Sequence, residues 1–452
     1  MENFNMKKGM VRNMQFQKPW KQGVLRVAEN GRYFYHDKTP FFWMGDTAWL
    51  LFHKLTLEET YCYLRNRKEL GVNVILADLI HGLEQQNVNG DYALLDDDFT
   101  RINDGGFWEH IDQVIRMAEE LGLYMGILPV WGNFHIKKGY LNMDNLEHYM
   151  NFLFKRFEKA PNIIWIVGGD VRGDVKPEVF CKMGELMKQD NPERLVGYHP
   201  FGRTSSSLWF HEEKWLDFNM FQSGHRRYDQ VQLNAWDDNS KAEGCFGEDS
   251  WRYVERDYNR PLVKPVLDGE PSYEWIVQGL HDFTQPYWQA ADVRRYAYWS
   301  VFAGAAGHTY GHNSIIQFYS DLSELGSYGA KYHWKDAIHH PGGAQMSHLK
   351  KLMESVDFTH GRPAQEYLLS EQGERYDYIS VFAGADYLFA YTVTGREVSV
   401  SLEAYAGKEM SAYWMDPVTG VQTFICEVTG KDKVTFLPPE REDGKDAVLI
   451  IR

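Results

Sequence analysis

The sequence predicts an α/β chain in which a (β/α)8 barrel, the TIM-barrel fold, is followed by a small antiparallel β-sandwich. Two observations carry this prediction. Between residue 21 and about residue 355, eight short apolar runs alternate with helical stretches, which is the order of a parallel barrel. After residue 355, short strands of alternating apolar and polar residues take over and no helix is evident. The expected divisions are a tail (1–20), a barrel domain (21–355) and a sandwich domain (356–452).

The first half of the barrel is marked by turns and helix ends. A hairpin is expected at residues 31–43, with a polar turn at 37–40. Thr56 and Glu59 have the spacing of a capping box, which predicts the start of a helix at 56–70. The other elements of this half are expected in the order strand 41–45, strand 73–79, helix 108–121, strand 124–130, helix 144–159 and strand 162–167.

The second half continues the same alternation. Its expected elements are strand 195–198, strand 218–221, strand 263–267, helix 291–302 and strand 307–310. The helix between the fifth and sixth strands is weakly marked, and an open, doubly wound sheet is the alternative fold. Against that alternative, residues 45–49 (GDTAW) stand where a nucleotide-binding sheet would have a glycine-rich phosphate loop. The sandwich strands are expected within 378–401, 411–423, 433–437 and 447–451.

The amino-acid composition limits which partners the protein can bind and in which cellular compartment it is expected. The chain has 452 residues, 48 Lys and Arg against 63 Asp and Glu, and a net charge of −15, which disfavours nucleic acid. Aromatic residues make up 15%, which is common in acidic proteins that bind neutral sugars and also in large apolar cores. The four cysteines show no paired spacing, and neither a signal peptide nor an apolar membrane-spanning run is apparent. We therefore expect a cytoplasmic protein without membrane contact.

Two carboxylates stand where an active site of this fold belongs, at the carboxyl ends of the strands. Asp170 ends the fourth strand and Glu270 ends the seventh, and glycine precedes each. These strands face each other across an eight-stranded ring, so their side chains can converge over its mouth. Retaining glycosidases need two carboxyl groups about 5–5.5 Å apart, one as acid/base and one as nucleophile. The competing interpretation is that each carboxylate is only a structural cap, and Glu274 is an alternative nucleophile.

The remaining strand ends carry side chains suited to neutral sugars. Lysine is absent among them, which disfavours Schiff-base chemistry and a phosphate site. His308 and His312 are four residues apart on a strand, a spacing that gives no shared face, and we expect no metal and no cofactor. The candidates for holding hydroxyl groups or stacking on a sugar ring are Asp46, Trp49, Trp131, His199, His225, Tyr273 and Tyr310.

Several motifs together resemble the apiosidase-like glycoside hydrolases (glycoside hydrolase family 140). They are the stretches at 41–49 (FFWMGDTAW), 168–170 (GGD), 267–274 (LDGEPSYE) and 307–311 (GHTYG). Residues 413–420 (YWMDPVTG) are similar to the small sandwich that accompanies this family and is labelled collagen-binding. The resemblance covers nearly the whole chain from about residue 21.

The resemblance implies a barrel of the large clan of retaining glycosidases, with Asp170 as acid/base and Glu270 as nucleophile. It also implies an oligosaccharide partner, since the characterised activity of the family is release at an apiose residue of a branched pectin. The wider clan carries Asn-Glu where this chain has Gly169-Asp170, a departure that agrees with the apiosidase branch. The alternatives are another β-glycosidase of the same clan, such as an arabinofuranosidase, a catalytically inactive carbohydrate-binding protein, or a collagen-adhesive protein.

Overall fold

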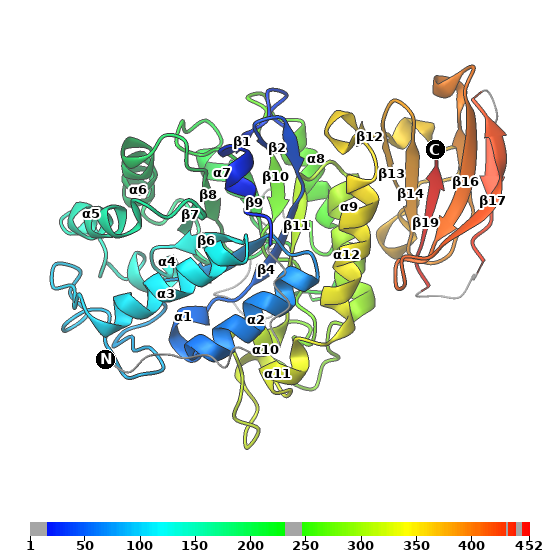
Figure 1. The fold of residues 1–452 in the computed structure, drawn as a ribbon. Helices are drawn as coiled ribbons and strands as arrows, with labels where there is room; N and C mark the ends of the chain where they lie inside the picture. Colours follow the sequence, from blue (N-terminus) through cyan, green and yellow to red (C-terminus); the bar gives the residue numbers. More distant parts are fainter. Residues whose placement is uncertain (1–15, 231–245, 431–432, 440–444) are drawn as a thin grey trace.

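The structure, a computed structural model, describes residues 16–230, 246–430, 433–439 and 445–452. The expected N-terminal tail lies mostly outside these residues. In Figure 1 the chain forms a barrel, coloured blue to yellow, and then a separate group of antiparallel strands, coloured orange to red. Within the described residues no helix is both long and apolar enough to cross a membrane. Cys62, Cys181 and Cys426 are free thiols.

Eight parallel strands form the barrel sheet in the order β8-β7-β6-β5-β4-β11-β10-β9. The two end strands, β8 and β9, lie side by side, so the sheet is nearly closed and the predicted fold class is confirmed. The strands are β4 (Trp43–Thr47), β5 (Val74–Asp78), β6 (Tyr124–Leu128), β7 (Ile163–Gly168), β8 (Val196–His199), β9 (Asn219–Phe221), β10 (Val266–Asp268) and β11 (Gly307–Tyr310).

Helices surround this sheet (Figure 1). They are α1 (Leu51–Lys54), α2 (Leu57–Glu69), α3 (Gly106–Glu120), α4 (Gly132–His135), α5 (Leu146–Phe157), α6 (Pro177–Asp190), α7 (Ser207–Phe210), α8 (Ser250–Tyr258), α9 (Ala290–Phe302), α10 (Asn313–Ile316), α11 (Trp334–Ala337) and α12 (Pro341–Glu354). The capping box of α2 is confirmed, because the side chains of Thr56 and Glu59 each accept a hydrogen bond from the backbone N–H of the other residue. The weakly marked helix after the fifth strand is the single turn α7.

Strand positions alternate between the barrel interior and the helix layer, as the period of two requires. Val74 and Leu76 of β5 belong to the interior cluster with Ile164 and Ile166 of β7. The intervening residues, such as Ile75 and Ala77, pack against the helices. This alternation decides which strand side chains can reach the mouth of the barrel.

Two strand starts differ from the prediction. β4 begins at Trp43, because Phe41 ends β3 (Thr39–Phe41), which pairs with β2 (Phe34–His36) in a hairpin tighter than expected. β10 begins at Val266, because Pro265 has no N–H to donate to a strand ladder. With β1 (Leu25–Val27), this hairpin forms a separate three-stranded sheet, and Phe34 packs on Trp43 of the barrel.

The C-terminal residues form two antiparallel sheets, as expected for the sandwich. A six-stranded sheet has the order β12-β13-β14-β19-β16-β17, and β15 pairs with β18. The strands are β12 (Arg362–Pro363), β13 (Ser380–Ala383), β14 (Leu388–Thr392), β15 (Val398–Ser401), β16 (Glu409–Met415), β17 (Gln422–Thr429), β18 (Lys433–Phe436) and β19 (Ala447–Ile451). The helical turns among them are one-turn 3-10 segments, such as 375–377.

The sandwich packs on α9 of the barrel, which contacts β13 and β14 (Figure 1). Tyr298 of α9 stacks on Tyr391 with ring centroids 4.7 Å apart, and Trp251 of α8 stacks on Tyr378 at 4.1 Å. A buried ion pair between Arg294 and Asp446, 2.7 Å long, crosses the same contact. The sandwich is therefore held against the barrel by both aromatic packing and charge.

Candidate active site

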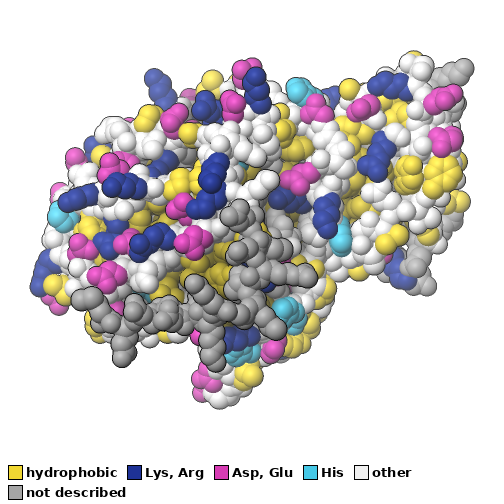
Figure 2. Space-filling view, viewed as in Figure 1, with side chains coloured by type: hydrophobic (Ala, Val, Ile, Leu, Met, Phe, Trp, Pro, Cys, Tyr) yellow, Lys and Arg dark blue, Asp and Glu magenta, His cyan; other side chains and the backbone are white. Residues whose placement is uncertain are grey.

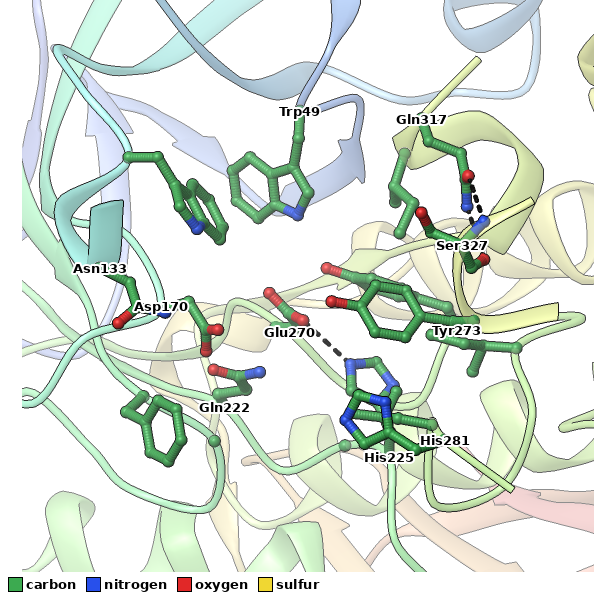
Figure 3. A pocket seen from close by; sticks show the side chains of 18 of the residues that line it. Trp49, Asn133, Asp170, Gln222, His225, Glu270, Tyr273, His281, Gln317 and Ser327 are labelled. Carbon is green, nitrogen blue, oxygen red and sulfur yellow. Dashed lines mark hydrogen bonds and ion pairs between the residues drawn. The ribbon is translucent and has the colours of Figure 1, made fainter. Parts of the chain in front are cut away.

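A pocket of about 270 Å³ opens at the carboxyl ends of the barrel strands. Figure 3 shows the carboxyl groups of Asp170 and Glu270 pointing into the same space, with the amide of Gln222 beside them and the indole of Trp49 over Glu270. The seven other predicted site residues are divided between this pocket and its surroundings. Of the predicted residues, the pocket is lined by Asp170, Glu270, Trp49, Trp131, His225 and Tyr273.

Glu270 follows β10 and is held by two histidines. The Nε2 atom of His225 is hydrogen-bonded to Oε1 of Glu270 at 2.9 Å, and Nε2 of His199 lies 3.1 Å from Oε2. The second contact is oblique and falls short of a well-aligned hydrogen bond. The backbone N–H of Asp170 points at Nδ1 of His199 at 3.4 Å, which leaves the proton of that ring on Nε2, toward Glu270.

These contacts set the protonation of Glu270. Burial alone would raise the pKa of this carboxyl, but its contacts with His199 and His225 outweigh burial, and the pKa lies well below its usual value. Gly269, directly before it, is required by close packing, since a Cβ there would lie 2.4 Å from the sulfur of Met220. Glu270 is therefore an ionised carboxylate fixed in the pocket wall.

Asp170 has the opposite electrostatic environment. Burial raises the pKa of its carboxyl, and the negative charge of Glu270 raises it further, against hydrogen bonds from Gln222 and the backbone of Gly202. The turn that presents it needs left-handed backbone at three successive residues, with φ of 93° at Gly168, 106° at Gly169 and 48° at Asp170. The sequence expectation that glycines allow a tight turn here is confirmed. Asp170 is therefore more readily protonated than an ordinary aspartate, beside a partner that is more readily ionised.

Aromatic rings form the wall above the two carboxyls. The rings of Trp49 and Trp131 lie 5.0 Å apart, and Trp131 also contacts His81 at 5.2 Å. Tyr273 lies on the other side of Glu270 (Figure 3), and burial together with the charge of Glu270 raises the pKa of its hydroxyl well above the usual value. These rings offer faces on which a sugar can stack.

Asp46, predicted to hold substrate, lies on the helix side of the barrel instead. Its carboxylate accepts a hydrogen bond from Nε of Arg67 at 2.8 Å and another from the hydroxyl of Tyr63, and it is fully buried. The physical reason is strand alternation: Trp43 points into the barrel, so Asp46, three residues on, points out toward α2. The prediction for Asp46 was wrong.

His199 and Tyr310 also lie behind the pocket wall. His199 is fully buried and reaches Glu270 rather than the open pocket. The hydroxyl of Tyr310 donates to Oε2 of Glu274 at 2.5 Å, and the same oxygen accepts the backbone N–H of Gly342 at the start of α12. Glu274, the alternative nucleophile, therefore accepts a hydrogen bond at the N-terminal end of α12 and is not among the pocket residues.

Several pocket residues were not predicted. Gln222 directly follows β9, so its position at a strand end was a usable signal, whereas Asn133 lies in α4, beyond the end of β6. Most of the others come from the loops after β8, β9, β10 and β11, where no periodicity marks them. They include Phe201, Arg203, Arg226, His281, Gln317, Ser327 and Tyr328.

The burial of Asp46 gives a prediction on stability. Replacing Asp46 with asparagine leaves the Arg67 guanidinium buried without its counter-charge, which should lower the free energy of unfolding by about 3–5 kcal/mol. KM of the folded enzyme should not change. Urea unfolding and steady-state kinetics measure the two quantities. Glu69→Gln, which removes the exposed ion pair with Arg65 on the same helix, is the control and should leave stability nearly unchanged. A raised KM at unchanged stability would restore Asp46 as a substrate residue.

Comparison with known proteins shows the class of enzyme to which this barrel belongs. A solved structure called "Glycoside hydrolase" is 42% identical, with a TM-score of 0.91 over 96% of this chain and 98% of that one. A glycoside hydrolase family 5 protein from Bacteroides vulgatus ATCC 8482 is 39% identical, with a TM-score of 0.90 over 96% and 95%. A search of curated protein sequences finds no match. The fold, the pocket and these relatives define a glycoside hydrolase.

The family is given by the match of residues 28–360 to the model "Apiosidase-like, catalytic domain". The chain belongs to the apiosidase-like family. Residues 362–452 match a second model, "Putative collagen-binding domain of a collagenase". Both domain resemblances expected from the sequence are therefore confirmed.

Proposed function

We propose that the protein is a retaining glycosidase that cleaves the bond of a furanose residue, apiose or a sugar like it, in plant pectic oligosaccharides. The observation that supports this proposal most is that the pKa values of the two carboxyl groups are shifted in opposite directions. The two histidines lower the pKa of Glu270 despite its burial, whereas burial and the charge of Glu270 raise the pKa of Asp170 in the same pocket. A retaining mechanism needs this division between a nucleophile and an acid.

The mechanism follows from these protonation states. An oxygen of Glu270 forms a bond to the anomeric carbon while the bond from that carbon to the leaving oxygen breaks. Asp170 gives its proton to the leaving oxygen, and the sugar remains as an ester of Glu270. Asp170, now ionised, then takes a proton from water as the water oxygen attacks the anomeric carbon. This second step frees Glu270 and restores the proton on Asp170.

The pocket favours one compact sugar at the site of cleavage. Its volume of about 270 Å³ is below the usual range of small-molecule sites, roughly 300–1,000 Å³. Trp49 and Trp131 provide the stacking faces, and Gln222 and Asn133 provide polar groups beside the carboxyls. The choice of apiose over another furanose comes from the family.

A hydrolysis screen tests this function. We expect release of apiose from pectic oligosaccharides and cleavage of aryl apiofuranosides. Cleavage of arabinofuranosides or galactofuranosides alone would favour another glycosidase of the same clan. Folded protein that binds these sugars but hydrolyses none of them would favour a carbohydrate-binding protein.

The protonation states predict the pH profile of kcat/KM. Activity needs Glu270 ionised and Asp170 protonated. The lowered pKa of Glu270 keeps it charged well below its ordinary value of 4.5, so the acid limb should be displaced downward. The raised pKa of Asp170 moves the alkaline limb well above the ordinary aspartate value of 3.8. Initial rates on an aryl apiofuranoside measure both limbs. An alkaline limb near pH 4 would contradict the assignment of the acid.

A further inference from the structure

Tyr328 lines the active-site pocket from the loop between α10 and α11, beyond the end of β11. It lies in a single helical turn, residues 327–329, and Gln317 and Ser327 line the pocket beside it. Figure 3 shows Gln317 and Ser327 on the opposite side of the pocket from Asp170, joined by two hydrogen bonds. This turn therefore forms the wall of the pocket that faces Asp170. In the space-filling view of Figure 2, basic and acidic side chains are interspersed over the barrel, so no single charge marks the face that is seen there.

The backbone at Tyr328 has a conformation that large side chains avoid. Its φ of 54° and ψ of 29° lie in the left-handed region. In this region the Cβ atom crowds the carbonyl oxygen that follows, so a tyrosine there costs stability. Such residues persist only where the surrounding structure holds them, and they are concentrated at ligand-binding and active sites. The conformation of Tyr328 therefore points to a role in the pocket.

Hydrogen bonds to neighbouring segments hold this turn in place. Nδ2 of Asn313, a buried side chain, donates to the carbonyl oxygen of Tyr328 at 2.9 Å. The hydroxyl of Tyr287 donates to the next carbonyl oxygen along the chain at 3.2 Å. Gln317 accepts the backbone N–H of Ser327 and donates to its carbonyl oxygen, both at 3.0 Å. The position of the Tyr328 ring is therefore fixed by the loop rather than by a ligand.

The hydroxyl of Tyr328 lies within the electrostatic influence of both carboxyl groups. Burial and the negative charges of Asp170 and Glu270 raise the pKa of Tyr328 to about 12. The hydroxyl therefore keeps its proton and can donate it in a hydrogen bond. Among the residues that the structure describes, none is hydrogen-bonded to this hydroxyl, and its ring contacts that of His281 at 5.8 Å. Tyr328 thus offers a donor beside the reacting centre.

We propose that Tyr328 is a substrate-binding residue whose hydroxyl donates a hydrogen bond to a ring hydroxyl of the sugar held at Asp170 and Glu270. This inference rests on the proposed function, because it concerns the same sugar. A donor enclosed by the bound sugar stays unpaired when the matching hydroxyl is missing, so the bond selects against sugars that lack it. Stacking on Trp49 and Trp131 does not make that distinction, since it uses only the apolar face of a sugar.

Steady-state kinetics of Tyr328→Phe tests the hydroxyl alone. We expect kcat/KM on an aryl apiofuranoside to fall about 3- to 10-fold, the size of one lost neutral hydrogen bond. The unfolding midpoint and both limbs of the pH profile should match those of the wild type. A displaced limb would show that the hydroxyl acts on the carboxyl groups instead, and a lower midpoint without a fall in kcat/KM would show a structural role. Either result would overturn the proposal.

Aryl apiofuranosides that each lack one ring hydroxyl identify the partner of this bond. On one of these deoxy substrates, the wild type and Tyr328→Phe should have equal kcat/KM, because the hydrogen bond is absent from both reactions. A loss that persists undiminished on every deoxy substrate would overturn the proposal. So would the absence of any loss on the parent substrate.

Tyr140→Phe is the matched control. Tyr140 is 39% exposed, against 38% for Tyr328, and lies between α4 and α5, outside the lining of the pocket. Its variant should equal the wild type on every substrate. If the wild type cleaves no furanoside, the proposed function fails, and calorimetry with the same compounds then tests Tyr328 by itself. Weaker binding to Tyr328→Phe would support the proposal, whereas equal affinity or no binding to either protein would overturn it.

Discussion

Replacing Glu270 with glutamine should lower kcat on an apiosidic substrate by about 10⁴-fold or more, because the amide cannot attack the anomeric carbon and no covalent ester forms. The substitution preserves the size of the side chain and a carbonyl oxygen that can still accept the hydrogen bond from His225. KM and the unfolding midpoint should therefore change little. Steady-state kinetics and thermal unfolding of the same sample measure both effects.

Glu274→Gln is the matched control for this experiment. Glu274 lies four residues further on, and its carboxylate accepts hydrogen bonds from Tyr310 and from the backbone of Gly342. The side-chain carbonyl oxygen of a glutamine can accept the same two hydrogen bonds. This variant should keep kcat within a few-fold of the wild type. The reverse result, a loss at Glu274 with activity retained at Glu270, would transfer the nucleophile to Glu274.

Replacing Asp170 with asparagine should lower kcat/KM by about 10²- to 10⁴-fold on oligosaccharides, the usual contribution of a general acid. The loss should be much smaller on an aryl glycoside whose phenol leaves without protonation. The alkaline limb of the pH profile should also disappear, since the group that titrates there is gone. Rates on both substrates across pH measure these effects.

Asp174→Asn controls for the loss of a nearby negative charge. Asp174 is exposed, pairs with Arg172 and does not line the pocket. Its variant should match the wild type on both substrates. An equal loss for Asp170→Asn on both substrates and an unchanged alkaline limb would show that Asp170 does not protonate the leaving group.

The barrel could be predicted from the sequence because parallel strands buried on both faces are continuous apolar runs. Residues 163–168, all buried, are an example. The same strand order placed Asp170 and Glu270 at the mouth, since each follows a strand directly. α6 was not predicted, although Val179, Met183 and Met187 recur on its buried side at helical spacing.

The finer assignments depended on side-chain direction, which a strand end alone does not define. The side chain of Asp46 points to the helix layer, where it binds Arg67, and so does not reach the pocket. Tyr310 does not line the pocket either, because its hydroxyl is hydrogen-bonded to Glu274. His199 proved to contact Glu270 from behind the pocket wall. The arginines of the pocket lie in long loops whose path depends on tertiary packing, so no local pattern identifies them.

Asp170 and Glu270 are proposed to act as a retaining pair. The most direct test is proton NMR of the first sugar formed when an aryl apiofuranoside is cleaved, recorded before the anomers equilibrate. We expect this product to have the same anomeric configuration as the substrate, because two displacements at one carbon restore it. A first product of opposite configuration would contradict the account.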